Sequence, residues 1–506
     1  MPRALVQVDS IKTDVFIVGA GAAGLFAALH LPEGTDILVA DKGRKGQGSS
    51  PWAQGGVAAA LGPDDSPDLH AADTMRVAAG HADASAVQVL CYEAPECVLE
   101  LAELGCEFDR NEDGTLHLAR EGGQTVSRSA HAEDSTGAAI MKTLRQHAAP
   151  RVTRVEGVCV KLVVVDGRCV GGWVLTDDGL VQVQATSTVL ASGGVGALFE
   201  ATTNPAGATG DGLVLAWEAG AGLADLEFVQ FHPTALAVGL GQQRVLITEA
   251  LRGAGAHVVD ADGRRFLFDY HSDGELAPRD VVARAISQRK SWLDCKPIPD
   301  ELMGKEFPTV LSGCRAVGID PLHDLIPVAP AAHYFIGGVQ TDLDGRASIP
   351  RLYAIGECSN IGVHGANRLA GNSLADALVF GRRAARAIAG QRKGWVKPIT
   401  EELELHEPHG DIEAGWAHLR RVFSDAMGIE RDPRKLAELP ALLEELAITE
   451  LSDDPASLEL RSGAIIARLM ARTAALRTES RGVHHRIDHP EPVTSWAGVR
   501  LRIARN

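Results

Sequence analysis

The chain has 506 residues, and its 49 Lys and Arg residues against 66 Asp and Glu residues give it a formal net charge of −17. Such an acidic balance argues against binding to nucleic acid or to an anionic membrane surface, because both repel a polyanion. Hydrophobic residues make up 45% and charged residues 23%, which is typical of globular proteins and excludes a disordered or fibrous chain. The length predicts several domains and a large buried core.

The sequence shows no membrane or secretion signal. No run approaches the about 18 apolar residues of a membrane span, and the first residues lack the apolar segment of a secretory signal. The eight Cys residues form no C-x-x-C pair and no zinc spacing. We therefore expect a cytoplasmic protein with reduced, buried thiols and no metal site.

The N-terminal segment predicts a strand, a glycine-rich turn, a helix and a second strand. The apolar run 14–18 ends in the glycine-rich segment 19–24, a helical stretch follows to Leu31, and the apolar run 37–40 closes on Asp41. This order is typical of the start of a parallel sheet with helices packed on it.

Three regions follow in chain order. From about 150 to 195, short apolar runs separated by Asp-Gly pairs indicate β-hairpins that end in a strand at 188–191. Residues 226–335 indicate an inserted α+β module. A strand at 352–355 then leads through the glycine-rich loop 362–371 to a helix from Leu374 to about Ala389.

Charged helices are expected beyond Gly390. Apolar side chains recur there at helical spacing, namely at Trp416, Leu419, Val422, Phe423, Ile465, Leu469 and Leu476. The predicted fold class is therefore α/β, with a Rossmann-like nucleotide-binding domain, an inserted α+β capping domain and a C-terminal helical bundle. The predicted boundaries are 1–225 and 336–392 for the two parts of the first domain, 226–335 for the capping domain and 393–506 for the helical domain.

The motif Gly19-x-Gly21-x-x-Gly24, placed between a strand and a helix, predicts a dinucleotide site. Gly19 permits the tight turn, Gly21 lets a pyrophosphate approach the backbone, and Gly24 lets the helix pack on the sheet. The helix N-terminus at Ala22 and Ala23 offers N–H groups and a partial positive charge to the phosphates.

Asp41 ends the second strand and is placed to accept hydrogen bonds from the adenosine ribose. This fingerprint alone leaves FAD and NAD open, whereas two features of the second glycine-rich region favour a flavin. The loop 365–374 opens a long helix, whose positive end favours the negative charge at the N1–C2 edge of a reduced flavin. Glu357 is placed to bond the ribityl hydroxyls, and Asn372 or Ser373 can also cap the helix.

An ordered set of motifs runs along nearly the whole chain. They are Ala-Gln-Gly-Gly at 53–56, Arg-Glu-Gly-Gly at 120–123, Gly-Asp-Gly at 210–212, Phe-His-Pro-Thr at 231–234, Thr-Glu-Ala-Leu-Arg-Gly at 248–253, Pro-Arg-Asp-Val-Val at 278–282, His-Tyr-Phe-Ile-Gly-Gly at 333–338, the loop 365–374, and Glu-Ser-Arg-Gly at 479–482 followed by His484, Arg486, Asp488 and Pro490. With these motifs the chain resembles the family of the succinate dehydrogenase and fumarate reductase flavoproteins, and most of all its aspartate-oxidising branch.

The resemblance implies that the cofactor is FAD. The residues it implies at the cofactor are Gly19, Gly21, Ala22, Ala23, Gly24, Asp41, Lys42, Ser49, Gln54, Gly55, Gly56, Ser192, Gly193, Gly194, Asp211, Glu357, Asn372, Ser373 and Leu374. Membrane-bound succinate dehydrogenases carry a flavin-linked His five residues before the Gln of the Ala-Gln-Gly-Gly motif. Because that position is Ser49 here, we expect FAD to be held non-covalently.

Glu121 stands where the succinate and fumarate enzymes of the family have a neutral Gln. Aspartate differs from succinate by an ammonium group, and a buried ammonium needs a carboxylate partner. Glu121 is therefore predicted to select aspartate, the alternative being a solvated loop acid.

The family motifs also imply a substrate site for a four-carbon dicarboxylate. Arg368 offers a bidentate donor fork for one carboxylate, helped by His333. His232, Thr248 and Glu249 are expected at the other end of the substrate.

The implied reaction transfers hydride from the Cα of L-aspartate to the flavin and yields iminoaspartate. O2, giving H2O2, or fumarate, giving succinate, then reoxidises the cofactor, and Arg279 is expected to protonate fumarate. A free Arg, with a pKa above about 12, is a poor base, so Glu121, water and Arg279 all remain candidates for accepting the ammonium proton. The resemblance further implies capture of iminoaspartate by quinolinate synthase on the way to NAD.

Two alternatives remain open: a soluble fumarate reductase or succinate-oxidising flavoprotein, and a catalytically silent FAD-binding sensor or assembly subunit. The chain departs from the aspartate-oxidising pattern at Gln124, often His, at 133–135, and at Ala254, often Glu.

Overall fold

The computed structural model describes residues 8–43, 48–238, 241–391, 399–400, 402–408, 410–446 and 450–505. A seven-stranded sheet at its centre has the order β6-β2-β1-β9-β8-β7, with β16 also paired to β9. Its strands are β1 (Val8–Val18), β2 (Ile37–Asp41), β6 (Thr153–Glu156), β7 (Val158–Val165), β8 (Arg168–Thr176), β9 (Gly179–Leu190) and β16 (Leu352–Ala354).

The pairing within this sheet confirms the predicted hairpins, with one exception. β7, β8 and β9 are successive antiparallel strands that turn at the two Asp-Gly pairs. β6 belongs to no hairpin: it runs parallel to β2, with Thr153 opposite Leu38. β1, β2, β9 and β16 are mutually parallel, so their carboxyl ends meet at one edge of the sheet.

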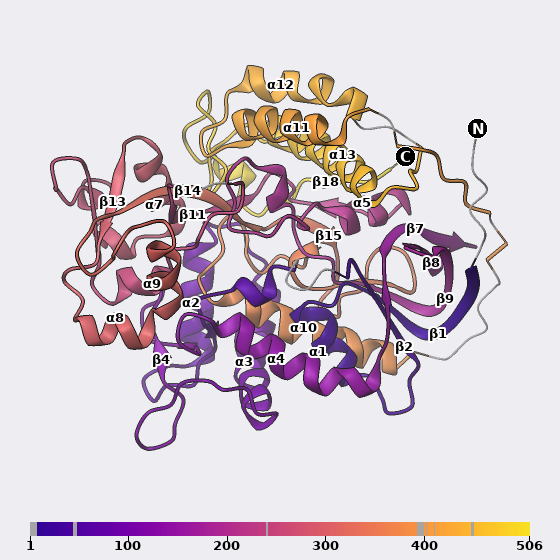
Figure 1. Cartoon of the computed structure of the whole chain (residues 1–506), viewed down its shortest axis with the longest axis horizontal. Helices are drawn as coiled ribbons and strands as arrows, with labels where there is room; N and C mark the ends of the chain where they lie inside the picture. Colours follow the sequence, from indigo (N-terminus) through magenta and orange to yellow (C-terminus); the bar gives the residue numbers. More distant parts are fainter. Residues whose placement is uncertain are drawn as a thin grey trace.

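Four helices pack together against one face of the sheet, at the bottom of Figure 1. They are α1 (Ala22–His30), α3 (Ala84–Glu103), α4 (Thr136–Ala148) and α10 (Asn372–Ala389). Phe26 of α1 and Phe380 of α10 are fully buried in the core between these helices and the sheet. α2 (Pro67–Val77) packs on α3. α5 (Asp211–Glu218) comes after β9 in the chain and contacts β7 and α13.

A second sheet lies beside the first, at the left of Figure 1, and has its own hydrophobic core. Its strands have the order β11-β14-β13-β12. They are β11 (Val229–Leu236), β12 (His257–Val259), β13 (Ser291–Asp294) and β14 (Ile326–Phe335). Its helices are α6 (Glu249–Gly253), α7 (Arg279–Ser287), α8 (Asp300–Glu306) and α9 (Pro308–Arg315). α7 packs on both β11 and β14.

Two small sheets connect distant segments. One has the order β17 (Ser359–Asn360), β15 (Gly338–Gln340), β10 (Leu223–Ala224) and β18 (Arg502–Ile503), which brings the end of the chain to its middle. The other has the order β3 (Val57–Ala58), β5 (Ser129–Ala130) and β4 (Leu118–Ala119).

The C-terminal helices α11 (Ile412–Met427), α12 (Pro433–Leu442) and α13 (Pro455–Leu476) lie together at the top of Figure 1. The predicted apolar stripe is correct for α11 and for Ile465 and Leu469 of α13, which pack against the core, and wrong for Leu476, which is 53% exposed. The buried face of α13 runs through Ile466, Met470 and Ala474 instead. Small alanines form much of this face, and a pattern of large apolar residues misses them. The predicted boundary at 392 and 393 lies outside the described residues.

Every one of the eight cysteines is buried and free of disulfide bonds. None of the described helices combines the length and the apolar character that a bilayer crossing demands.

Candidate functional site

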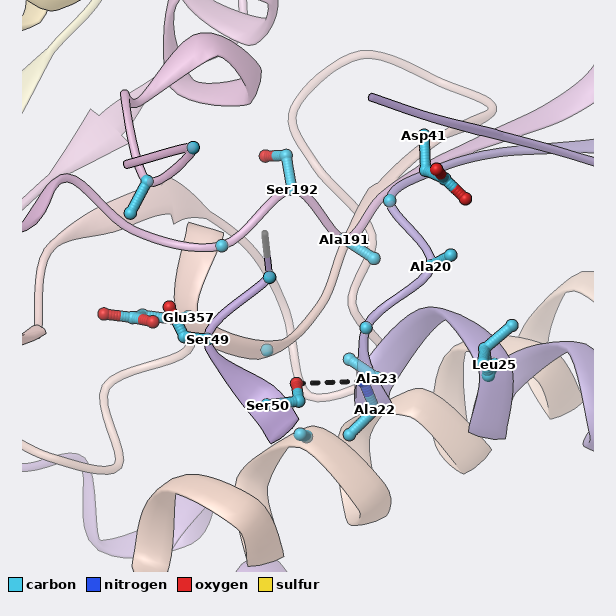
Figure 2. A pocket seen from close by; sticks show the side chains of 18 of the residues that line it. Ala20, Ala22, Ala23, Leu25, Asp41, Ser49, Ser50, Ala191, Ser192 and Glu357 are labelled. Carbon is cyan, nitrogen blue, oxygen red and sulfur yellow. Dashed lines mark hydrogen bonds between the residues drawn. The ribbon is translucent and has the colours of Figure 1, made fainter. Parts of the chain in front are cut away.

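A cavity of about 570 Å³ opens at the carboxyl ends of the parallel strands β1, β2, β9 and β16. Residues at or just beyond the ends of these strands line it, among them Gly19. Figure 2 shows three others, Asp41, Ser192 and Glu357. Ligands of open α/β sheets bind at this edge, and the volume lies within the range of small-molecule and cofactor sites.

Three helix N-termini meet at the cavity. The first residues of α1, α5 and α10 line it, and each helix is preceded by a glycine that provides no side-chain cap: Gly21, Gly210 and Gly371. Uncapped first turns present backbone N–H groups and a partial positive charge. The Ala22 N–H donates to Ser50 Oγ at 3.1 Å (Figure 2), and the Asn372 N–H donates to the Leu369 carbonyl at 3.2 Å. The arrangement suits a ligand with a negatively charged phosphate group.

The position of Gly19 requires a glycine, because both the backbone conformation and the space around it exclude a side chain. Its φ of +112° is a left-handed conformation, and a Cβ there would lie 2.3 Å from the carbonyl oxygen of Ala191. The glycine motif at the end of β1 therefore brings the chain close to the next strand and leaves the space above it to a ligand.

Two charged residues at the end of β2 are held by partners from other elements. The Asp41 carboxylate accepts two hydrogen bonds from the Arg154 guanidinium, from Nε at 2.6 Å and from Nη2 at 2.7 Å. Lys42 Nζ lies 2.6 Å from both Asp211 of α5 and Glu459 of α13. Burial alone would lower the pKa of Lys42, but these two carboxylates raise it above its ordinary value.

Glu357 lies at the other end of the cavity from Asp41 in Figure 2. Its carboxylate accepts a hydrogen bond from the Phe335 N–H at 2.8 Å. Burial raises the pKa of Glu357 to about 7, and burial also raises the pKa of Asp376 on α10 to about 7, with the charge of Glu357 adding to it. The cavity wall at this end therefore contains one carboxyl group, that of Glu357, which is protonated in part near neutral pH.

The remaining residues predicted at the cofactor divide into three groups. Ala22, Ala23, Ser49, Gly193, Gly194, Ser373 and Leu374 line the cavity. Gly24 packs α1 onto the sheet, and Gly55 and Gly56 lie against the carboxylate of Glu121. Gln54, the residue before them, is buried.

Asn372 corrects the prediction, because its side chain is turned toward α2. The Asn372 side chain pairs with His70 Nε2 at 2.8 Å and donates to Thr74 Oγ1 at 3.0 Å. Both ends of its amide are therefore used away from the cavity.

A cluster of charged and imidazole side chains begins where the cavity ends. His333 and Tyr334 line the cavity. The His333 ring lies 5.0 Å from the ring of His232, and the Arg368 guanidinium lies 4.6 Å above the ring of Tyr334. His333 Nδ1 is paired with Thr203 Oγ1 at 2.8 Å. The structure thus brings together His232, His333 and Arg368, which lie far apart in the sequence.

Arg279, the first residue of α7, is the centre of this cluster. Its Nε donates to Glu249 Oε2 at 2.6 Å, and its Nη2 lies 3.8 Å from Glu121 Oε2. The second oxygen of Glu249 lies 2.9 Å from Arg252. Although burial acts against it, these two arginines hold the pKa of Glu249 below its ordinary value. Glu249, predicted to contact substrate, is thus an ionised support for two arginines.

Thr248 is buried and caps α6 through its side chain, which accepts from the Ala250 N–H. It therefore holds the helix that carries Glu249 and Arg252 beside the cluster.

Glu121 is not a solvated loop acid, because only 3% of it is exposed. Its carboxylate accepts a hydrogen bond from the Gly56 N–H at 3.0 Å. Burial raises the pKa of Glu121, and Arg279 offsets part of that rise. Gln124, one of the departures from the family pattern, accepts from the Glu121 N–H at 3.0 Å and holds this turn.

The two histidines are neutral in this surrounding. Burial, with Arg279 nearby, holds the pKa values of both His232 and His333 well below the ordinary value. Burial and the charge of Arg279 also lower the pKa of Arg368 to about 10. Positive charge in the cluster therefore comes from guanidinium groups and not from imidazoles.

Sequence reasoning missed two residues of the cluster, Gln230 and Tyr334. Gln230 is fully buried and bonds to both Arg279 and Arg368. Tyr334 supports the Arg368 guanidinium. Gln230 directly precedes the motif at 231–234, and Tyr334 lies within the motif at 333–338. From the sequence, roles were assigned only to the histidines of these motifs, so the two residues beside them were overlooked.

The fold and the two joined sites define a dinucleotide-binding flavoprotein. The family model for the FAD binding domain matches residues 14–374, and that for the fumarate reductase flavoprotein C-terminus matches residues 416–503. L-aspartate oxidase of Caulobacter vibrioides is 44% identical over 96% of this chain and 94% of its own, and that of Nostoc sp. is 41% identical over 96% and 92%.

A mutant of E. coli quinol fumarate reductase superimposes with a TM-score of 0.90 at 29% identity, covering 99% of this chain and 95% of its own. The chain therefore belongs to the FAD-dependent family of the fumarate reductase flavoproteins and the L-aspartate oxidases. Its cofactor is FAD, and the glycine turn at Gly19 and the three uncapped helix N-termini fit that group.

Proposed function

We propose that this chain is an L-aspartate oxidase, which oxidises L-aspartate to iminoaspartate. The observation that carries the proposal is the buried Glu121 carboxylate at the arginine cluster. Bound FAD supplies the two-electron oxidation. Glu121 pairs with the substrate ammonium, Arg368 and His333 hold one substrate carboxylate, and His232 lies toward the other end.

Charge balance supports aspartate over its analogues. The guanidinium groups of Arg252, Arg279 and Arg368 and the carboxylates of Glu121 and Glu249 leave one net positive charge in the cluster. Aspartate, with two carboxylates and one ammonium, carries one net negative charge, whereas succinate and fumarate carry two. Opposite and equal charges lower the cost of burying the substrate.

Fumarate is the second substrate we propose, as acceptor of the electrons, and Arg279 is its proton donor. The raised pKa of Glu121 allows this carboxyl to hold a proton when a dianion occupies the site. Glu249 keeps Arg279 oriented through its 2.6 Å hydrogen bond. A purely fumarate-reducing flavoprotein is the alternative function, favoured by the likeness to quinol fumarate reductase.

The proposal includes a second electron acceptor and a use for the product. O2 accepts electrons from the reduced cofactor and gives H2O2, and iminoaspartate is handed to quinolinate synthase for NAD synthesis. The enzyme works in the cytoplasm, and its domain boundaries are those predicted from the sequence.

The proposal also holds that FAD is bound non-covalently, because Ser49 occupies the position of the linking His. Acid precipitation should therefore leave a white pellet and a yellow supernatant.

The variant Glu121→Gln tests the function. We expect it to lower kcat/KM for aspartate at least about 100-fold, because a buried ammonium loses its charged partner. Fumarate reduction should stay within a few-fold of wild type, since the neutral amide resembles the protonated carboxyl. The measurement is flavin bleaching by aspartate under argon, alongside fumarate reduction by dithionite-reduced enzyme.

The matched control is Glu112→Gln, an exposed acid of a nearby loop, which should change neither rate. Equal loss of both activities in Glu121→Gln would contradict the role of Glu121. Failure of aspartate to bleach the wild-type flavin, with fumarate reduction intact, would establish the fumarate-reducing alternative.

A further inference from the structure

One neutral side chain connects two positive groups of the substrate cluster. Gln230 of β11 is 0% exposed, and its Oε1 accepts from Arg279 Nη1 at 3.2 Å and from Arg368 Nη2 at 2.9 Å. Arg279 comes from α7 of the second sheet, whereas Arg368 comes from the loop before α10. A single oxygen thus joins guanidinium groups that different parts of the chain supply.

The amide of Gln230 has only one possible orientation. Its Nε2 donates to Asn367 Oδ1 and to the carbonyl oxygen of Arg368, both at 2.8 Å. A flipped amide would direct N–H groups at two guanidinium donors, which have no acceptor to offer. The acceptor oxygen is therefore fixed between the arginines.

The hydrogen bonds continue into a closed ring. Asn367 Nδ2 donates to Asp280 Oδ1 at 2.8 Å, and Asp280 is the chain neighbour of Arg279. The ring thus runs from Arg279 through Gln230 and Asn367 to Asp280 and back along the chain. Both arginines are tied to one rigid frame, so their separation does not depend on a bound substrate.

A neutral acceptor has a clear advantage over a carboxylate at this position. Two guanidinium groups close together in a buried site repel each other, and an acceptor between them reduces that repulsion. A carboxylate would do so more strongly, but it would cancel the net positive charge that attracts a dicarboxylate. The neutral amide holds the two guanidinium groups in place, and their positive charge remains available to bind the substrate carboxylates.

We propose that Gln230 is the positioning residue that sets the spacing between Arg368, the carboxylate anchor, and Arg279, the proton donor. This inference rests on the proposed function. It predicts that Arg368 can hold one carboxylate while Arg279 reaches an alkene carbon of the same substrate only when the shared acceptor is present. Gln230 contacts the arginines and acts on the substrate through them.

Two variants of holoenzyme test the inference, with one control. Gln230→Met keeps the side-chain size and removes the acceptor, and Gln230→Glu keeps the acceptor and adds a negative charge. Gln182→Met removes a buried amide of β9 that donates to the Ile399 carbonyl, far along the chain from the cluster. KM and kcat are measured with aspartate and with fumarate, and flavin content and Tm are measured for each variant.

We expect Gln230→Met to raise KM for both substrates about tenfold and to lower kcat for fumarate about tenfold, at unchanged flavin content. Gln230→Glu should raise KM for fumarate, a dianion, at least about tenfold more than KM for aspartate, a monoanion. That selective change is the result a merely structural role would not produce. Gln182→Met should alter Tm alone.

Two results would overturn the inference. One is a Gln230→Met enzyme with KM and kcat within twofold of wild type for both substrates. The other is a Gln230→Glu enzyme that loses both substrates equally or loses only flavin. In either case wild-type turnover of aspartate still supports the proposed function, whereas a wild type that turns over neither substrate refutes that function itself.

Discussion

The cofactor cavity and the charged cluster share a border but are built by different means. The cavity is formed mainly by backbone groups: strand ends, uncapped helix starts and a glycine turn that leaves no room for a side chain. The cluster is formed around ionised side chains from four segments of the chain, and those of Glu121, Glu249, Arg252 and Arg279 lie 2.6 to 3.8 Å from their partners. We therefore expect the cavity to lose its cofactor when a new side chain fills it. The cluster should lose its function when one of its charged side chains is removed.

The largest effect is expected from closing the cavity. In Gly19→Val the new side chain meets the Ala191 carbonyl and the left-handed φ of +112° is strained, so the turn must move. We expect protein purified without visible flavin and without activity. The absorption spectrum near 450 nm checks this directly, and retention of full flavin would show that the turn is not the cofactor's support.

The second effect removes the centre of the cluster. Arg279→Leu should lower kcat for fumarate by about 10²–10⁴, the usual share of a positioned proton donor. FAD should stay bound, because the cavity walls are unchanged. Stopped-flow oxidation of the reduced enzyme by fumarate measures the rate, and a loss of flavin in this variant would show that the two sites are not separable.

A smaller effect concerns pH and the carboxyl group of Glu357. Its pKa is raised to about 7, so in the protein without FAD it is largely protonated at pH 5.5 and ionised at pH 8. Hydroxyl groups of the ribityl chain favour the ionised form, so FAD binding should release a proton and FAD affinity should rise with pH toward 7 and then level off. Glu357→Gln should flatten this rise, which fluorescence titrations at several pH values can follow.

The smallest effect is expected from the histidines. Burial and nearby guanidinium groups keep the pKa of His232 and the pKa of His333 well below the ordinary value, so both rings are neutral across the working range. In the Glu121→Gln variant, where that carboxyl no longer titrates, KM for fumarate should therefore change less than about twofold between pH 6 and 8. A clear sigmoidal change centred near 6.5 would mean that one imidazole is charged when substrate binds.

Sequence patterns predicted the cavity better than the cluster, for a physical reason. A strand, a glycine turn and a helix are local, and Gly19, Gly24 and Asp41 can be assigned from their spacing alone. Arg279, His232 and Arg368 were found only through resemblance to a family, since no local pattern shows that they meet. Gln230 was missed because a neutral amide carries no charge signal until its two partners are seen.

Two errors have similarly concrete origins. Asn372 was assigned to the cofactor because it opens α10, but its direction depends on His70 and Thr74, about 300 residues earlier. Leu476 was placed in a buried stripe because large apolar residues were counted and alanines were not. In both cases the deciding partner is distant or small.

The buried cysteines have a consequence for the proposed use of O2 as an electron acceptor, which would yield H2O2. Peroxide attacks thiolates that it can reach. Burial raises the pKa of Cys91 and Cys97 to about 12, and Cys106 and Cys314 to about 11. Peroxide released beside the flavin would therefore meet protonated, buried sulfur at these positions, which protects the thiols from oxidation.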